Sequence, residues 1–219
     1  MTVPPNLPQT DLNLRHSSLR QRRIGLTGGI ATGKSTVSHY LEQRYSVPVF
    51  DADRYAREAV VPGSVVFHHI VHRYGPGIVE PSGVLDRSQL GEIIFAQPEE
   101  RRWLEAQIHP IVQAQFRQAL GEHQRHPVVT LSIPLLFEAG YHLNQGETWV
   151  TEIWVVTCSV AQQCHRLKER NGFSEATALR RIQAQMPLAE KCRLADHILD
   201  NSGSQADLYT QIDRLWIGF

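Results

Sequence analysis

The chain has 219 residues, and its 22 lysines and arginines balance its 22 aspartates and glutamates. A hydrophobic fraction of 42% and a charged fraction of 20% exclude a disordered or fibrous chain. The neutral balance argues against a general binder of nucleic acids or anionic membranes, and no apolar run suits a membrane-spanning helix. We therefore expect one globular domain with an insertion, or two small domains, and no nucleic-acid or membrane partner. The sequence indicates no oligomeric state.

The cysteines and the N-terminal residues refine this expectation. Three cysteines, with no CxxC pair among them, favour a reduced cytoplasmic protein over a disulfide framework or a cysteine zinc site. Residues 1–22 are rich in arginine and proline and carry no apolar segment of signal-peptide type. We expect them to form a flexible N-terminal tail, with a transit peptide as the alternative.

Beyond residue 23, short apolar strands alternate with longer helical stretches. Strands are expected at 24–27, 47–51, 128–133, 152–157 and 197–199. Strands separated by helical crossovers predict an α/β fold, with a five-stranded parallel sheet flanked by helices on both faces.

The helical periodicity places one long block between the second and third strands. Helices are expected from Lys34, at 159–170, at 174–185 with Ser174 as N-cap, and at the C-terminus. Residues 54–126 contain no strong strand and are predicted as helices at 54–60, 64–74, 87–96, 98–108 and 110–122. This block is interpreted as a substrate-binding insertion into a core made of residues 23–53 and 127–219.

A glycine-rich segment follows the first strand directly. Residues 28–35 read GGIATGKS and match G-x-x-x-x-G-K-[ST] in full, with a strand before and a helix after. Glycines let successive N–H groups face one anion, and the helix adds its positive end. Lys34 is expected to reach the β- and γ-phosphates, and the Ser35 hydroxyl to bind Mg²⁺. The segment predicts a nucleoside triphosphate site.

Acidic residues end the second strand. Asp51 and Asp53 lie where the phosphate crevice of such a sheet opens. One of them can accept a proton from an attacking hydroxyl, and the other can cap the helix expected from Arg54. We assign the catalytic role to Asp53.

Basic residues gather late in the chain, between 166 and 193. Arg166 and Arg170 lie on one helix face and can clamp phosphoryl oxygens from a lid, and an ordinary solvated face is an equal alternative. His68, His69 and His72 are interpreted as ordinary helix residues rather than metal ligands, because no partner motif accompanies them.

Several stretches together resemble the dephospho-coenzyme A kinase family. They are LTGGIATGKST (26–36), FDADRYAREAVVPG (50–63), LDRSQLGEIIF (85–95), IHP (108–110), PLLFE (134–138), RLKER (166–170) and DHILDNSG (196–203). They occur in the family's order and extend from about residue 22 to the end. The resemblance implies a P-loop kinase core, a helical coenzyme A-binding insertion at about 54–126 and a mobile lid at about 166–193.

The resemblance also implies an activity and a set of site residues. The expected reaction is Mg²⁺-dependent transfer of phosphate from ATP to the 3′-hydroxyl of dephospho-coenzyme A. Asp53, Lys34 and Arg166 would be catalytic, and Asp53, Arg87 and His109 would contact the acceptor. The ATP-binding set would be Gly28, Gly29, Ile30, Ala31, Thr32, Gly33, Lys34, Ser35, Thr36, Arg166 and Asn201.

Two other functions compete with this interpretation. The first is another small-molecule P-loop kinase, of nucleoside monophosphate or shikimate type, against which the PLLFE and IHP stretches argue. The second is a GTPase-like switch, since residues 200–203 superficially fit DxxG, but the sequence lacks NKxD for guanine.

Overall fold

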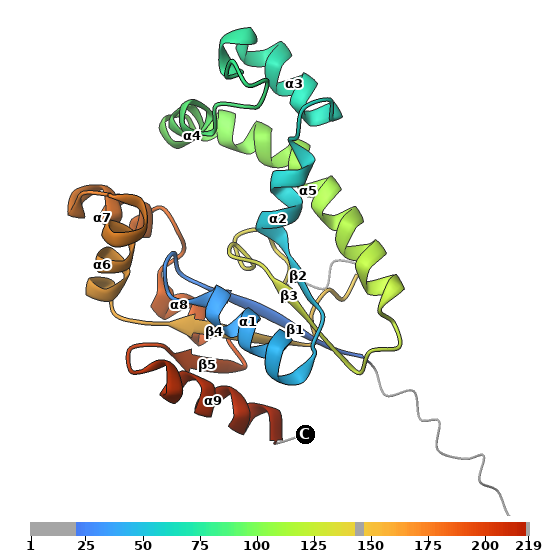
Figure 1. Cartoon of the computed structure of the whole chain (residues 1–219), viewed down its shortest axis with the longest axis vertical. Helices are drawn as coiled ribbons and strands as arrows, with labels where there is room; N and C mark the ends of the chain where they lie inside the picture. Colours follow the sequence, from blue (N-terminus) through green and yellow to red (C-terminus); the bar gives the residue numbers. More distant parts are fainter. Residues whose placement is uncertain (1–20, 143–146, 218–219) are drawn as a thin grey trace, which may run out of the picture.

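The computed structural model describes residues 21–142 and 147–217. At its centre lies a five-stranded parallel sheet in the order β2-β3-β1-β4-β5 (Figure 1). This confirms the predicted sheet. The strands are β1 (Arg22–Gly28), β2 (Val49–Asp51), β3 (Val128–Ser132), β4 (Glu152–Thr157) and β5 (His197–Asp200).

Helices cover both faces of the sheet, as expected for parallel strands joined by crossovers. On one face lie α1 (Lys34–Tyr45) and α9 (Gln205–Ile217), and on the other α5 (Pro98–Glu122) and α8 (Leu188–Arg193). The remaining helices are α2 (Ala52–Ala59), α3 (Val65–Tyr74), the short η1 (Pro76–Ile78), α4 (Arg87–Ala96), α6 (Val160–Asn171) and α7 (Glu175–Gln183).

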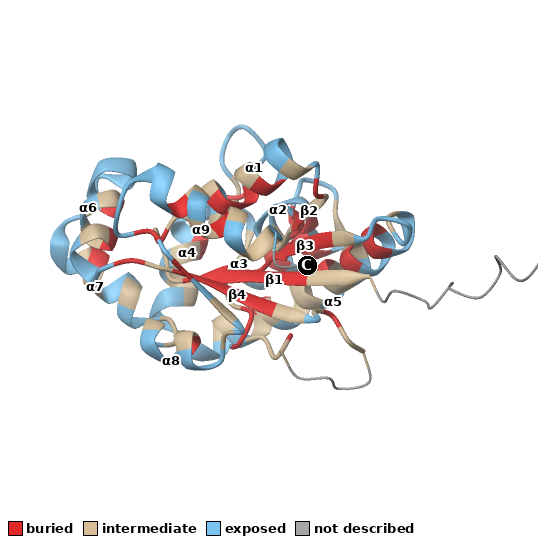
Figure 2. Ribbon diagram, turned by 90° about the horizontal axis from the view of Figure 1, so that it is seen from below, coloured by how far each residue is buried: buried red, intermediate tan, exposed pale blue. Residues whose placement is uncertain are grey.

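The strands are apolar on both sides because both sides are covered. In β4, Trp154 and Val156 pack under α1 and α9, while Ile153 and Val155 point to the opposite cluster. Figure 2 shows the resulting buried centre, with exposed residues on the outer faces of the helices. The sheet is therefore a rigid support for whatever its strand ends carry.

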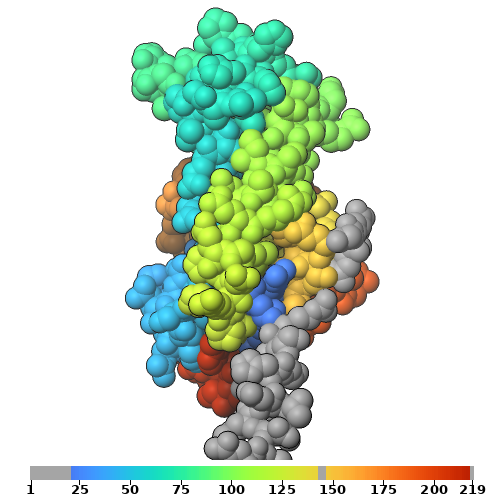
Figure 3. Space-filling view, turned by 90° about the vertical axis from the view of Figure 1, so that its right-hand side faces the viewer, coloured from blue at the N-terminus to red at the C-terminus, as the bar shows by residue number. Residues whose placement is uncertain are grey.

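A third hydrophobic cluster lies outside the sheet and holds a helical block together. Val66 and Ile70 of α3, Leu90 of α4 and Leu104 of α5 are buried in it. Figure 3 shows this block standing beyond the core, with α5 running from it down to the sheet. The block corresponds to much of the helical stretch expected between the second and third strands.

The prediction of two helices at 98–108 and 110–122 is wrong, because α5 continues through Pro110. Proline removes one N–H and normally interrupts a helix. Here Leu104 is buried in the block and Val112 and Phe116 are buried against the sheet. Packing at both ends outweighs the local cost, and Pro110 itself is exposed.

Other boundaries shift by a few residues. β1 begins at Arg22, inside the tail predicted for residues 1–22, of which residues 1–20 lie outside the described part. The helix expected from Arg54 begins at Ala52, with Asp51 as its N-cap. Ser174 caps α7 as predicted. The short helix α8 was not predicted.

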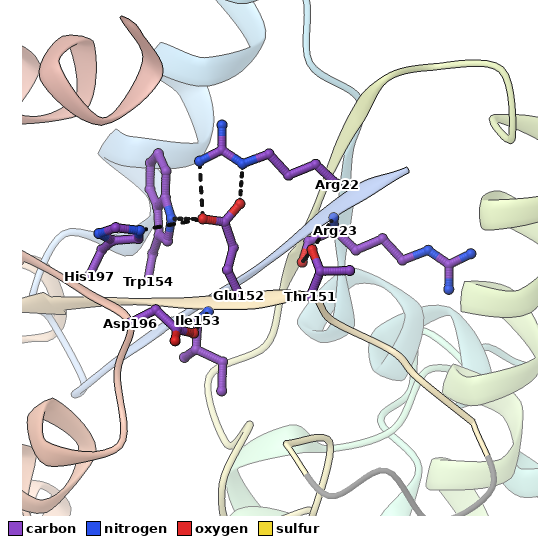
Figure 4. A network of polar contacts seen from close by, with 8 residues as sticks. All are labelled: Arg22, Arg23, Thr151, Glu152, Ile153, Trp154, Asp196 and His197. Carbon is purple, nitrogen blue, oxygen red and sulfur yellow. Dashed lines mark hydrogen bonds and ion pairs between the residues drawn. The ribbon is translucent and has the colours of Figure 1, made fainter. Parts of the chain in front are cut away.

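A polar network joins the amino ends of three neighbouring strands (Figure 4). Arg22 of β1 and Glu152 of β4 form a bidentate ion pair, and the Trp154 Nε1–H donates to Glu152 Oε2 at 3.1 Å. His197 Nε2 of β5 lies 3.5 Å from the same carboxylate oxygen. This network is at the end of the sheet opposite the carboxyl ends, so it stabilises the sheet without occupying that edge.

Candidate active site

Every strand of the sheet contributes a polar group at or just beyond its carboxyl end. In open α/β sheets, ligands bind at this edge. The contributing groups are residues 28–35 after β1, Asp51 in β2, Ser132 in β3, Cys158 after β4 and Asn201 after β5. Arg166 Nη1 lies 3.6 Å from Cys158 Sγ, and the contacts described below bring the other groups to the same place.

Residues 28–35, the phosphate loop, form a tight turn that leads into α1. The Thr32 hydroxyl donates to the Gly29 carbonyl at 2.9 Å, and Gly33 has a φ of 102° directly before the helix. A Cβ on Gly28 would lie 2.5 Å from the carbonyl oxygen of Val156, so no larger residue fits there. This backbone provides a glycine-rich turn and a helix N-terminus together, as an anion site requires.

Two side chains of helix α6 donate hydrogen bonds to carbonyl groups of the phosphate loop. Gln163 Nε2 donates to Ile30 O at 2.6 Å, and Arg166 Nη1 donates to Ala31 O and Thr32 O, both at 3.2 Å. These donors occupy oxygens that would repel a phosphate. The structure thus places Arg166 at the phosphate loop, bonded to its backbone, and the predicted clamping of phosphoryl oxygens stays a prediction.

Asn201 belongs to the same set of contacts. Its Nδ2 donates to Thr32 O at 2.7 Å, and its own carbonyl accepts from Arg166 Nη2 at 3.0 Å. Asn201, directly after β5, therefore holds the phosphate loop from one edge of the sheet, whereas Asp51 lies in β2 at the other edge. Its predicted contact with the nucleotide stays a prediction.

Lys34 lies between β1, β2 and β3. Its Nζ donates to Ser132 Oγ at 2.5 Å and lies 3.9 Å from Asp51 Oδ2, while the Ser132 hydroxyl donates to the same Oδ2 at 3.1 Å. Desolvation lowers the pKa of Lys34, and the carboxylates of Asp51 and Asp53 oppose this shift. A poorly solvated ammonium near a helix N-terminus is well placed to pair with phosphate oxygens.

The two acidic residues after β2 have different roles. Asp51 is the N-cap of α2, accepting from Arg54 N at 3.1 Å, which leaves Asp53 in the exposed first turn. Although Asp53 is accessible, desolvation by neighbouring protein raises its pKa; Lys34 lowers it and Asp51 raises it further. A carboxyl group with a raised pKa beside an ammonium suits proton transfer.

Two arginines extend the site towards the helical block. Arg57, one turn after Asp53, opposes the rise in the pKa of Asp53 and donates through Nε to the Asp53 carbonyl at 3.0 Å. Arg87 of α4 donates to the Arg57 carbonyl at 3.4 Å. His109 is half-buried in α5, and no hydrogen bond or ion pair among the described residues joins it to this group. Its role stays a prediction.

The site also contains residues that the sequence analysis did not identify: Arg57, Ser132, Gln163 and Gln185. Arg57 follows Asp53 by four positions, and Ser132 lies next to the carboxyl end of the strand predicted at 128–133, so helical spacing and the carboxyl-end rule could have indicated both. Gln163, which donates to Ile30 O, and Gln185, whose Oε1 accepts from the Ile30 N–H, reach the loop through tertiary packing, for which no local signal exists.

The residues at the start of α1 fit the chemistry of a magnesium ion. Ser35 is exposed in the first helical turn, directly after Lys34, whose Nζ lies 3.9 Å from Asp51 Oδ2. Hydroxyl and carboxylate oxygens are ligands that Mg²⁺ prefers. Thr36 lies in the same turn, where its N–H donates to Gly33 O at 3.0 Å.

Comparison with known proteins decides which P-loop family carries this site. The family model for dephospho-CoA kinase matches residues 22–207, which include the phosphate loop, Asp53, Arg166 and Asn201. The chain belongs to the dephospho-CoA kinase family. A dephospho-CoA kinase of Synechocystis sp. is 60% identical over 197 residues, 90% of this chain and 96% of that protein.

Solved structures share the fold of this chain. The protein TT1252 of Thermus thermophilus is 33% identical, with a TM-score of 0.75 over 91% of this chain and 98% of that one. Dephospho-CoA kinase from Campylobacter jejuni shares the fold at 24% identity, with a TM-score of 0.64 over 89% of this chain and 95% of that one. Within the described residues, no helix has the length and apolar character to cross a membrane.

Proposed function

We propose that the chain transfers the γ-phosphoryl group of ATP to the 3′-hydroxyl of dephospho-CoA, the final step of coenzyme A synthesis. The observation that carries this proposal is the family match over residues 22–207, supported by 60% identity to a dephospho-CoA kinase. The geometry agrees, because an ammonium, a carboxyl group of raised pKa and a phosphate loop meet at one sheet edge.

The residues divide the work as follows. Backbone N–H groups of the phosphate loop and the Lys34 ammonium bind the β- and γ-phosphates and stabilise charge that grows in the transition state. Asp53 accepts the proton of the 3′-hydroxyl. At the same time the hydroxyl oxygen bonds to the γ-phosphorus, and the bond from that phosphorus to the bridging oxygen of ADP breaks. Arg166 stabilises the conformation of the phosphate loop by donating to the carbonyl groups of Ala31 and Thr32. Bound through Ser35, Mg²⁺ would supply positive charge to the phosphate oxygens.

The helical block is assigned to the acceptor. Its own hydrophobic cluster makes α3, α4 and the first half of α5 a unit. Arg87 of α4 donates to the carbonyl of Arg57 in α2, and the Arg57 Nε donates to the Asp53 carbonyl. An acceptor held between this block and the sheet edge would present its hydroxyl to Asp53. We keep Arg87 and His109 as the acceptor-side residues, the segment at about 166–193 as a lid, and the cytoplasm as the location.

A panel of acceptors tests the activity. ADP release is followed in a coupled assay with ATP, Mg²⁺ and one of dephospho-CoA, AMP, CMP or shikimate. We expect dephospho-CoA to give the fastest release, with the new phosphate on the 3′-oxygen by phosphorus NMR. The 3′-deoxy analogue is the control and should be inert. Faster release with AMP, CMP or shikimate would overturn the proposal.

A further inference from the structure

One side chain contacts the phosphate loop differently from the others. Gln163 and Arg166 donate to loop carbonyls, whereas Gln185 Oε1 accepts from the Ile30 N–H at 2.8 Å. The Ile30 carbonyl is at the same time bonded to Gln163. The peptide groups on both sides of Ile30 are therefore fixed in direction.

The next residue explains why this fixation matters. Ala31 has a φ of 58°, in the left-handed region that a residue with a Cβ adopts only at a cost of about 1–2 kcal/mol. Such a conformation persists only where surrounding contacts enforce it. The bonds to Ile30 and the Arg166 bond to Ala31 O are among these contacts, together with the bond from the Thr32 hydroxyl to Gly29 O that spans Ala31.

Gln185 is itself held in place by a buried ion pair. It lies in the short connection between α7 and α8, which returns beside the loop (Figure 1). The N–H of Met186 donates to Glu138 Oε1 at 3.1 Å, and Lys191 Nζ lies 2.9 Å from that same oxygen. Lys191 is fully buried, so its charge requires this partner.

The same network returns to the strand that carries the loop. Lys191 Nζ also donates to the Pro134 carbonyl at 3.1 Å, which in turn accepts from the Thr27 hydroxyl of β1 at 3.1 Å. Pro134 and Glu138 are the ends of the PLLFE stretch. That stretch thus joins the α7–α8 connection to β1.

We propose that Gln185 is a positioning residue of the phosphate loop, and that the Glu138–Lys191 pair fixes the backbone from which Gln185 reaches Ile30. Gln185 keeps the loop in its binding conformation, so nucleotide affinity depends on a residue outside the loop. The proposal rests on the proposed function only in that the loop binds ATP.

Calorimetric titration of ATP with Mg²⁺, in the absence of any acceptor, tests the role of Gln185. Gln185→Met keeps the length of the side chain and removes the acceptor, and we expect ATP to bind roughly fivefold more weakly. Gln183→Met is the matched control, because Gln183 is exposed at the end of α7, and it should bind as the unchanged chain does. Equal nucleotide-free melting temperatures would show that the loss is not due to unfolding.

Two results would overturn the proposal. If Gln185→Met binds ATP as the unchanged chain does, the contact has no positioning role. If it binds ATP more tightly, the carboxamide competes with the nucleotide for the Ile30 N–H. Failure of the unchanged chain to bind ATP would contradict the proposed function instead, and failure of dephospho-CoA as acceptor would leave this inference standing.

A second variant tests the ion pair. Glu138→Met combined with Lys191→Met removes both charges and the acceptor of the Met186 N–H, and leaves no unpaired buried ammonium. We expect a similar loss of ATP affinity, and little further loss when Gln185→Met is added, because residues that act through one contact are not additive. Fully additive losses would show that the pair does not act through Gln185.

Discussion

Lys34 and Asp51 face each other across the hydroxyl of Ser132, with Nζ 3.9 Å from Oδ2. This places the ammonium at the carboxyl ends of three strands and out of full contact with water. Its pKa is lowered because desolvation outweighs the attraction of the carboxylates. A bound phosphate would bring negative charge into direct contact with the Lys34 ammonium, whereas the Asp51 carboxylate lies 3.9 Å away.

Lys34→Met should reduce kcat at least about 100-fold, because it removes charge stabilisation from the transition state. Its effect on stability should be small or favourable at pH 7. The folded pKa lies below the ordinary value of 10.5, so the unchanged chain gains stability as the pH rises from the folded pKa towards 10.5. The Met variant lacks this gain. Nucleotide-free thermal melts at pH 7 and pH 10 measure it, and a large loss at pH 7 would contradict the placement of Lys34.

Asp53→Asn should lower kcat by about 10²–10⁴-fold, since the amide cannot take the acceptor's proton. ATP affinity, measured by calorimetry, should hardly change. Asp51→Asn is the comparison, because Asn still caps α2 and does not remove the base. Near-normal turnover of Asp53→Asn with loss in Asp51→Asn would reverse the two assignments.

The pKa of Asp53 makes a pH prediction of its own. The folded pKa is raised, so the carboxylate is disfavoured in the native state and its cost appears as the pH rises through the folded value. Asp53→Asn should therefore melt at or above the temperature of the unchanged chain at pH 7, and the difference should vanish below the ordinary value of 3.8. The acid limb of the kcat/KM profile should lie above that value and disappear in the variant.

Arg166→Lys should damage both the phosphate loop and turnover. The guanidinium donates to Ala31, Thr32 and Asn201 at once, which a single ammonium cannot reproduce. We expect a loss of about 1–3 kcal/mol in unfolding free energy and a fall in kcat that exceeds the rise in the KM for ATP. Lys168→Arg, on the exposed side of α6, is the control. Unchanged kinetics in Arg166→Lys would mean that the loop keeps its shape without these bonds.

Two glycines should respond to alanine in opposite directions. A Cβ at Gly28 would meet the Val156 carbonyl at 2.5 Å, and overpacking against backbone costs about 1–3 kcal/mol. Gly91 lies inside α4 with nothing within 4 Å of the added Cβ, and alanine there should stabilise the helix by about 0.5–1 kcal/mol. Chemical denaturation of the two variants measures both changes. Similar values would show that the close approach at Gly28 relaxes freely.

The parts of the site that the sequence predicted are those in which neighbours in the chain are neighbours in space. The phosphate loop and its helix are contiguous, and Asp51 follows from the end of a predicted strand. The contacts of Gln185 with Ile30 and of Asn201 with Thr32 join positions 155 and 169 residues apart, and no periodicity records them. The helix break predicted at Pro110 is wrong for a related reason, because burial at both ends of α5 maintains the helix.

The strand order has a consequence for how the protein is made. β1 leaves the ribosome first, yet its neighbours β3 and β4 begin at residues 128 and 152, and Thr32 bonds to Asn201 169 positions later. At about 5–20 residues per second, synthesis of that interval takes roughly 10–30 s. The strand before the glycine-rich segment has no neighbour until β3 is made, and the bond from Asn201 to Thr32 comes later still. The nucleotide site thus forms at the end of translation, from the segment that was translated near its start.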